Sequence, residues 1–161
     1  MRRLLMRGFA ASLIFFAAVS LCLAGPPEST KPGPRDKCPV CGMFVAKYPD
    51  FVTQVIFRDG AVFYFDGVKD LMKFYFHLDR YSPGRKQADV AAVWVTDYYR
   101  MSLIDGRKAH YVIGSDVYGP MGKELIPFEK KTEADEFLKD HRGERIIPFD
   151  GITPDLIKGL D

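Results

Sequence analysis

The sequence contains few cysteines and has almost no excess of basic over acidic residues. Only three of its 161 residues are cysteines, too few for a disulfide scaffold. Residues 1–24 carry three arginines and no acidic residue, so the formal net charge falls from +2 for the whole chain to −1 for residues 25–161. Without a basic excess we expect no nucleic-acid partner. Stability must come from a packed core, which the aromatic residues, 14% of the chain, can supply.

The first 24 residues have the features of an export signal. Three arginines precede an apolar run over 9–23, and a Pro/Gly-rich stretch follows it. The run is shorter than the ~20 residues that a spanning helix needs. This pattern is typical of a signal peptide, with cleavage after Ala24 and release into the periplasm. Lipid anchoring at Cys22 is the alternative, although Leu21 fits the lipoprotein pattern poorly, and a retained N-terminal anchor helix also stays open.

The rest of the chain alternates between strand-like and helix-like patterns. Segment 25–36, "GPPESTKPGPRD", predicts a flexible linker before the folded region 37–161. Asp59-Gly60 lies between two β-rich runs and predicts a hairpin. The remaining pattern predicts a helix over 67–78, a strand over 89–100, a strand near 111–113, a tight loop and strand over 118–129, a helix over 131–143 with Thr132 as N-cap, a strand over 144–149 and a helix over 153–160.

The second half of the chain resembles the first when the sequence is shifted by 63 positions. Hydrophobic register then persists through a strand, a polar turn and a helix. One such unit is too small to bury its sheet alone, so two packed copies make physical sense. We therefore predict an α+β fold of two related ββαβ units, about 38–100 and 101–161, with chance alignment as the alternative. The matched pairs include Phe65 with Phe128, Asp66 with Glu129, Asp70 with Glu133 and Phe74 with Phe137.

The stretch "CPVCGM", residues 38–43, carries most of the chemistry. A structural zinc site needs four ligands, and there is no second cysteine pair. The stretch does not follow a strand and open a helix, as a redox motif normally does. A passive disulfide between Cys38 and Cys41 remains open in an oxidising compartment. A c-type haem is excluded because Gly42 stands where histidine is needed. The three histidines, His77, His110 and His141, are scattered, and His110 is the best candidate for an extra donor.

Sulfur donors favour a softer ion than zinc. Thiolates and thioethers together select Cu(I), which two or three ligands satisfy. Met43 lies two residues after Cys41, and Met121 lies between Pro120 and Gly122, an unusual setting for a core methionine. We expect Met72 and Met101 to fill gaps in the core instead. The candidate ligands are Cys38, Cys41, Met43 and Met121.

Three stretches resemble the NosL family of copper chaperones that accompany nitrous oxide reductase: "CPVCGM", "YFDGVKDLMKF" and "IGSDVYGPMGKELIPFEKKTEADEF". The resemblance covers about 36–150. It implies one Cu(I) ion held by sulfur, with ligands among Cys38, Cys41, Met43 and Met121. It also implies two related ββαβ units and delivery of copper for maturation of the copper sites of nitrous oxide reductase. The implied partner is that reductase or its membrane-bound assembly machinery, with another copper acceptor as a further option.

Other functions stay open from the sequence. The stretch also resembles the YHS metal-binding module, where a "YYFC" strand follows; here "FYFD" places Asp66 at the position of that cysteine. A carboxylate is a poor donor for Cu(I). General periplasmic copper trafficking and a structural protein with a bridged cysteine pair are further alternatives. An enzyme built on Asp66, Asp70 and Glu129 lacks a nucleophile–base pair, and solvated helix starts explain these acids better. We therefore expect a protein that is not an enzyme.

Overall fold

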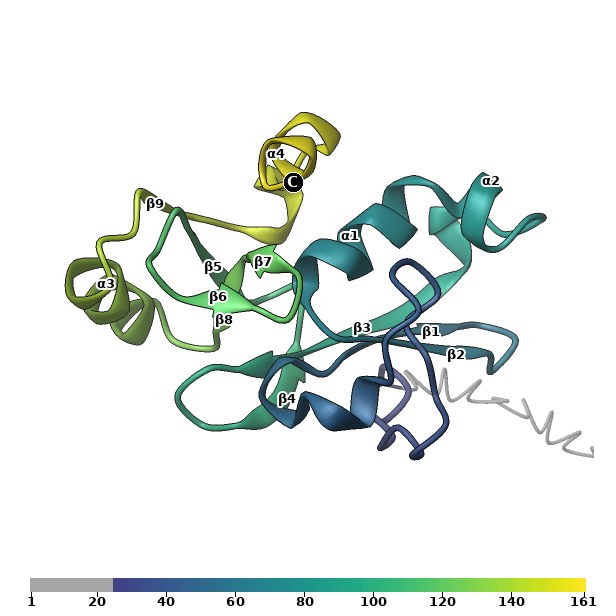
Figure 1. Cartoon of the computed structure of the whole chain (residues 1–161). Coiled ribbons are helices and arrows are strands. Elements are labelled where there is room, and N and C mark those ends of the chain that lie inside the picture. The colour runs from purple at the N-terminus through teal and green to yellow at the C-terminus, as the bar shows by residue number, and fades with distance from the viewer. Residues whose placement is uncertain (1–24) are drawn as a thin grey trace, which may run out of the picture.

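The structure, a computed structural model, describes residues 25–161 and has an α+β architecture with two antiparallel sheets (Figure 1). The first sheet has the order β2-β1-β3-β4 and the second has the order β8-β5-β9; β6 and β7 form a separate two-stranded hairpin. The strands are β1 (Thr53–Phe57), β2 (Val62–Phe65), β3 (Val90–Asp97), β4 (Ser102–Asp105), β5 (His110–Ile113), β6 (Tyr118–Gly119), β7 (Gly122–Lys123), β8 (Ile126–Phe128) and β9 (Arg145–Ile147). The α-helices are α1 (Val68–Phe76), α2 (Leu78–Tyr81), α3 (Lys131–Asp140) and α4 (Pro154–Gly159).

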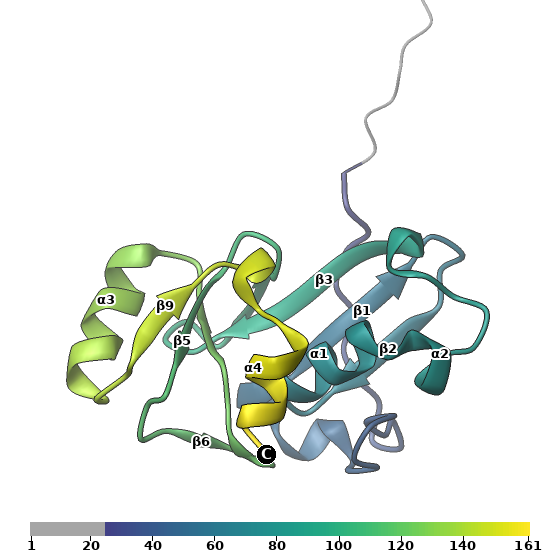
Figure 2. The ribbon, with the colours of Figure 1, turned by 90° about the horizontal axis from the view of Figure 1, so that it is seen from above.

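Each sheet packs against one main helix through aromatic side chains. On the first sheet, Phe74 of α1 lies with its ring centroid 5.1 Å from that of Phe65. On the second sheet, Phe137 of α3 lies 5.0 Å from Phe128 in the same way. All four rings are buried, so each helix is fixed to its own sheet. Figure 2 shows these two layers on opposite sides of the molecule, with α4 between them and beside α1.

The class α+β is confirmed, and part of the strand order is similar in the two sheets. In the first sheet β1 lies between β2 and β3, and in the second β5 lies between β8 and β9. The offset of 63 positions holds for β2 with β8 and for α1 with α3, but not for the flanking strands. β4 pairs with β3 and so extends the first sheet past the predicted unit boundary at residue 100. The internal repeat therefore stays a prediction.

The N-terminal segment 25–36 is held against the first sheet, which corrects the prediction of a flexible linker. The backbone N–H of Thr30 donates to Gln54 Oε1 at 3.0 Å, and Gln54 Nε2 donates back to the Thr30 carbonyl at 2.9 Å. Trp94 Nε1 donates to the Pro27 carbonyl at 3.0 Å. The buried amide of Gln54 needs these partners, so the segment completes one face of the sheet. Residues 1–24, with the predicted signal peptide and Cys22, lie outside the described residues.

Two further sequence predictions are wrong in detail. Met101 is 52% exposed because it lies in the turn between β3 and β4 with a φ of 55°, whereas Met72 is buried as expected. Thr132 does not cap α3, since Lys130 occupies the N-cap position without a side-chain hydrogen bond.

The hairpin at Asp59-Gly60 is confirmed between β1 and β2.

A buried carboxyl group fixes the start of α1. Glu124, which follows β7, accepts the backbone N–H of Lys69 at 2.6 Å and that of Leu125 at 2.9 Å through Oε1. The first N–H groups of a helix have no partner within the helix, so an oxygen that accepts from one of them stabilises the helix start. Glu124 approaches so closely that a Cβ on Gly67 would lie 2.1 Å from its Oε2. A side chain at position 67 would therefore have to displace the carboxyl group of Glu124 from the helix start.

Burial raises the pKa of Glu124 to about 8, from 4.5. A carboxyl whose pKa is raised by folding contributes stability that is complete below pH 4.5 and is lost as the pH rises through 8. We expect the unfolding free energy of the reduced, metal-free protein to fall between these two pH limits. The variant Glu124→Gln, whose amide does not titrate, should lack this fall, and the difference between the two proteins should be on the order of 3 kcal/mol. Urea denaturation of both proteins across this pH range measures the difference. Parallel pH profiles would contradict the assignment.

Candidate metal centre

The cysteine stretch forms a closed loop near the N-terminus of the described chain. The Cys38 N–H donates to the Met43 carbonyl at 2.9 Å, and the Gly42 N–H donates to the Cys38 carbonyl at 2.8 Å. Gly42 has a φ of 80°, in the left-handed region that favours glycine. Just after the loop, Val45 is buried in the core and anchors it. The loop therefore presents both thiols from a fixed backbone.

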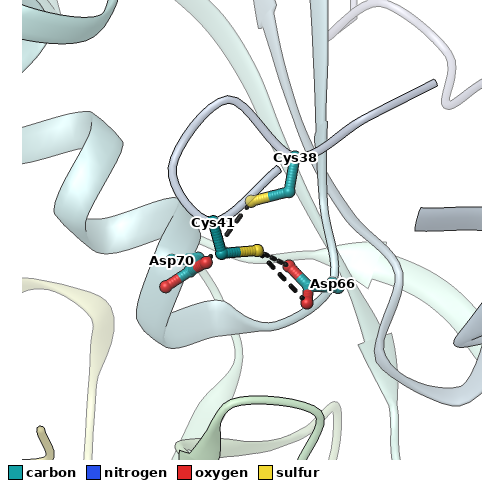
Figure 3. A group of neighbouring side chains, drawn as sticks. All are labelled: Cys38, Cys41, Asp66 and Asp70. Carbon is teal, nitrogen blue, oxygen red and sulfur yellow. Dashed lines mark hydrogen bonds between the residues drawn. The ribbon is translucent and has the colours of Figure 1, made fainter. Parts of the chain in front are cut away.

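Four donor side chains meet where this loop reaches the start of α1. Their ligand atoms all lie within 4.8 Å of one another (Figure 3). Cys38 Sγ donates to Asp70 Oδ2 at 3.3 Å, and Cys41 Sγ donates to Asp66 Oδ1 at 3.2 Å. Asp66 follows β2 and Asp70 lies in the first turn of α1, so the β2–α1 connection supplies both acids. We call these four residues the thiol–carboxylate cluster.

Both thiols are protonated at neutral pH. Burial raises the pKa of the Cys38 thiol far above its usual value of 9.0. Burial, with added contributions from its hydrogen bonds to Asp70 and Asp66, raises the pKa of Cys41 to about 12. A metal ion that binds these sulfurs must therefore displace two protons. The nearest proton acceptors are the two carboxylates that the thiols already contact.

The two acids correct the sequence interpretation. Asp66 and Asp70 were expected at solvated helix starts, but their exposures are 1% and 3%. The third acid of that set, Glu129, lies elsewhere, with its carboxylate 3.3 Å from Arg100. One sequence signal did indicate the role of Asp66, namely its alignment with a metal-binding cysteine of the YHS module. With these acids the cluster offers four donors, two soft and two hard, where the sequence alone provided too few for a four-coordinate ion.

The two candidate methionines are placed differently around the cluster. Met43 is half-buried and belongs to the cysteine loop itself. Met121 lies in the turn between β6 and β7, and it is 43% exposed. Its carbonyl accepts a hydrogen bond from Lys69 Nζ at 2.7 Å, and Lys69 directly precedes Asp70. Figure 1 shows this hairpin beside the start of α1. The structure thus brings the cysteines together with Asp66 and Asp70, while ligation by the two methionines stays a prediction.

The histidines lie apart from the cluster, as their scatter in the sequence indicated. His77 follows α1, His110 begins β5, and His141 follows α3, where its Nδ1 lies 3.0 Å from Asp116 Oδ1. The only group of three or more potential His, Cys, Asp or Glu ligands found among residues 25–161 is the thiol–carboxylate cluster. Within the same range, the structure has no helix with both the length and the apolarity that crossing a bilayer requires.

Known proteins resemble this chain over most of its length. The sequence model of the NosL family matches residues 29–157. The copper-binding lipoprotein NosL of Stutzerimonas stutzeri is 28% identical over 131 residues, which cover 76% of this chain and 65% of that protein. The chain therefore spans a little less than two thirds of this relative. The crystal structure of the copper chaperone NosL from Shewanella denitrificans superposes with a TM-score of 0.69 and 25% identity, covering 81% of this chain and 99% of that one.

The thiol–carboxylate contacts can be tested by cysteine reactivity. Replacing Asp66 and Asp70 together by asparagine removes two negative acceptors that raise the pKa of Cys41. The thiolate fraction then rises, and alkylation of the metal-free protein by iodoacetamide at pH 8 should accelerate about threefold to tenfold. Glu129→Gln is the matched control, because it removes a carboxylate that pairs with Arg100 instead. Equal alkylation rates in all three proteins would rule out the pairing.

Proposed function

The chain belongs to the NosL family, and on this premise we propose that it is an exported copper chaperone that binds one Cu(I) ion and passes it to an acceptor. Cys38 and Cys41 supply the two primary sulfur ligands, and Met43 and Met121 supply thioethers. The observation that carries the proposal is the pair of free thiols that one closed loop directs into a common cluster. The names of the two relatives, a copper-binding lipoprotein and a copper chaperone, support copper as the cargo.

The donor set suits holding and release rather than catalysis. Cu(I) prefers soft sulfur ligands and is stable with two or three of them. Cys38 is 1% exposed, whereas Cys41 is half-buried, so an incoming ligand meets the metal from the Cys41 side. Copper uptake releases two thiol protons, so copper affinity falls as the pH falls. Ligand exchange transfers the ion without a chemical change in the chain, and we propose that the protein is not an enzyme.

A titration of residues 25–161 with Cu(I) tests this proposal directly. The reduced protein competes for copper with a chromophoric Cu(I) chelator under anaerobic conditions. We expect Cys38→Ser combined with Cys41→Ser to weaken binding by about a thousandfold or more, because both thiolates are lost. Met43→Ala and Met121→Ala should each weaken it about tenfold, whereas Met101→Ala, an exposed methionine in the β3–β4 turn, should not. Tight Cu(I) binding by the variant that lacks both thiols would contradict the proposal.

We further propose that the chain acts in the periplasm and serves nitrous oxide reductase or its membrane-bound assembly machinery. The signal-like residues 1–24 support export, and the name of the Stutzerimonas relative supports a lipid anchor, for which Cys22 is the candidate. A transfer assay tests the recipient: copper-loaded protein is incubated with copper-free reductase and its assembly factors, and copper in the separated reductase is measured. Native protein should load it, and the double cysteine variant should not. Loading of an unrelated periplasmic copper acceptor alone would favour general copper trafficking.

A further inference from the structure

Lys69 is a buried cation beside the thiol–carboxylate cluster, and none of its contacts is with the four cluster side chains. It is only 2% exposed. Its Nζ donates to the Met121 carbonyl at 2.7 Å and to the Leu160 carbonyl at 3.3 Å, and it lies 3.7 Å from Asp161 Oδ1. A buried ammonium group is costly unless such acceptors surround it. Lys69 therefore joins the start of α1 to two segments that are distant in the sequence.

The hairpin segment 118–124 is bound to Lys69 at two points. The Lys69 backbone N–H donates to Glu124 Oε1 at 2.6 Å, on the far side of the hairpin from the Met121 contact. The hairpin is itself closed, with Tyr118 paired to Lys123 and Gly119 paired to Gly122. These bonds fix the backbone of Met121 relative to the first turn of α1, which carries Asp70 of the cluster.

Met121 itself, by contrast, is open to solvent. The residue is 43% exposed and is one of five large apolar residues with substantial exposure in the described part of the chain. A thioether on a fixed backbone loses little freedom when it binds a metal, and it can leave again without moving the fold.

We propose that Lys69 is a positioning residue that holds Met121 beside the thiol–carboxylate cluster, so that its thioether can join and leave the copper ion. This inference rests on the proposed function, because it requires that Met121 ligate Cu(I). The hydrogen bond from Lys69 Nζ to the Met121 carbonyl fixes the backbone position of Met121 and so restricts the position of its thioether. Glu124 holds the end of the same hairpin against α1. Without that bond, the turn between β6 and β7 is no longer connected to α1 at Met121, the residue whose thioether would bind copper.

The test is a double-variant cycle on Cu(I) affinity. Lys69→Met keeps the length and apolar stem of the side chain but removes the donor. We expect it to weaken Cu(I) binding about tenfold, as loss of a residue that orients a ligand typically does. Met121→Ala should weaken binding to a similar extent, and the two changes combined should be no worse than either alone, because both remove the same ligand.

Two results would overturn the inference. Unchanged affinity in Lys69→Met would show that the bond positions nothing. Independent effects, with the combined variant weakened by the product of the single changes, would show that Lys69 acts through general stability. Asp161→Asn is the control, because it removes the ion pairs of the chain end with Lys69 and Lys73 and leaves the Met121 contact. It should bind Cu(I) like the native protein, and a tenfold loss would assign the effect to the ion pairs of Asp161 instead.

The cycle also separates this inference from the proposed function. If Met121→Ala binds normally while the double cysteine variant does not, the positioning role fails and the chaperone proposal stands. If the native protein does not bind Cu(I), the proposed function itself fails. Should Lys69→Met not fold, nitrogen-15 NMR of the lysine side chains in the native protein decides. We expect slowly exchanging Nζ protons for Lys69 whose signal shifts on copper loading, and exchange as fast as at exposed lysines overturns the inference.

Discussion

The hydrogen bond from the Lys69 backbone to the buried carboxyl group of Glu124 determines where α1 begins, and the thiol–carboxylate cluster is built around that helix start. The first turn of α1 carries Asp70, and the residue before the glycine N-cap is Asp66. Both acids face the cysteine loop because the helix starts almost directly after β2, with Glu124 packed closely against Gly67. A shift of the helix start by one residue would turn Asp70 away from the thiols.

Proton balance at the cluster explains how one site can both hold and release a metal ion. Burial disfavours the thiolate form of each cysteine, which lowers metal affinity relative to an exposed pair. The closed loop and the short distances between donors act in the opposite direction, since little reorganisation is needed on binding. Of the two thiols, that of the half-buried Cys41 is the more accessible to solvent.

The two sheets contribute unequally to this site. The first supplies Asp66 at the end of β2 and the platform for α1, while the second carries the hairpin with Met121 as an insertion between β5 and β8. They are joined near Asp97, whose buried carboxylate accepts the Glu129 N–H at 2.7 Å from the second layer. The hairpin then contacts the start of α1 through the bonds of Met121 and Glu124 with Lys69.

Local pattern in the sequence determined most of the strands, the main helices and the resemblance to the NosL family, because periodicity and turn residues act over a few positions. Tertiary structure alone decided that Asp70, 32 residues from Cys38, accepts a hydrogen bond from its thiol, and that segment 25–36 lies on the sheet. The same applies to Lys69 and Met121, which are 52 residues apart. Such contacts depend on how helix α1, the cysteine loop and the β6–β7 hairpin pack against one another. The periodicity of the sequence carries no information about that packing.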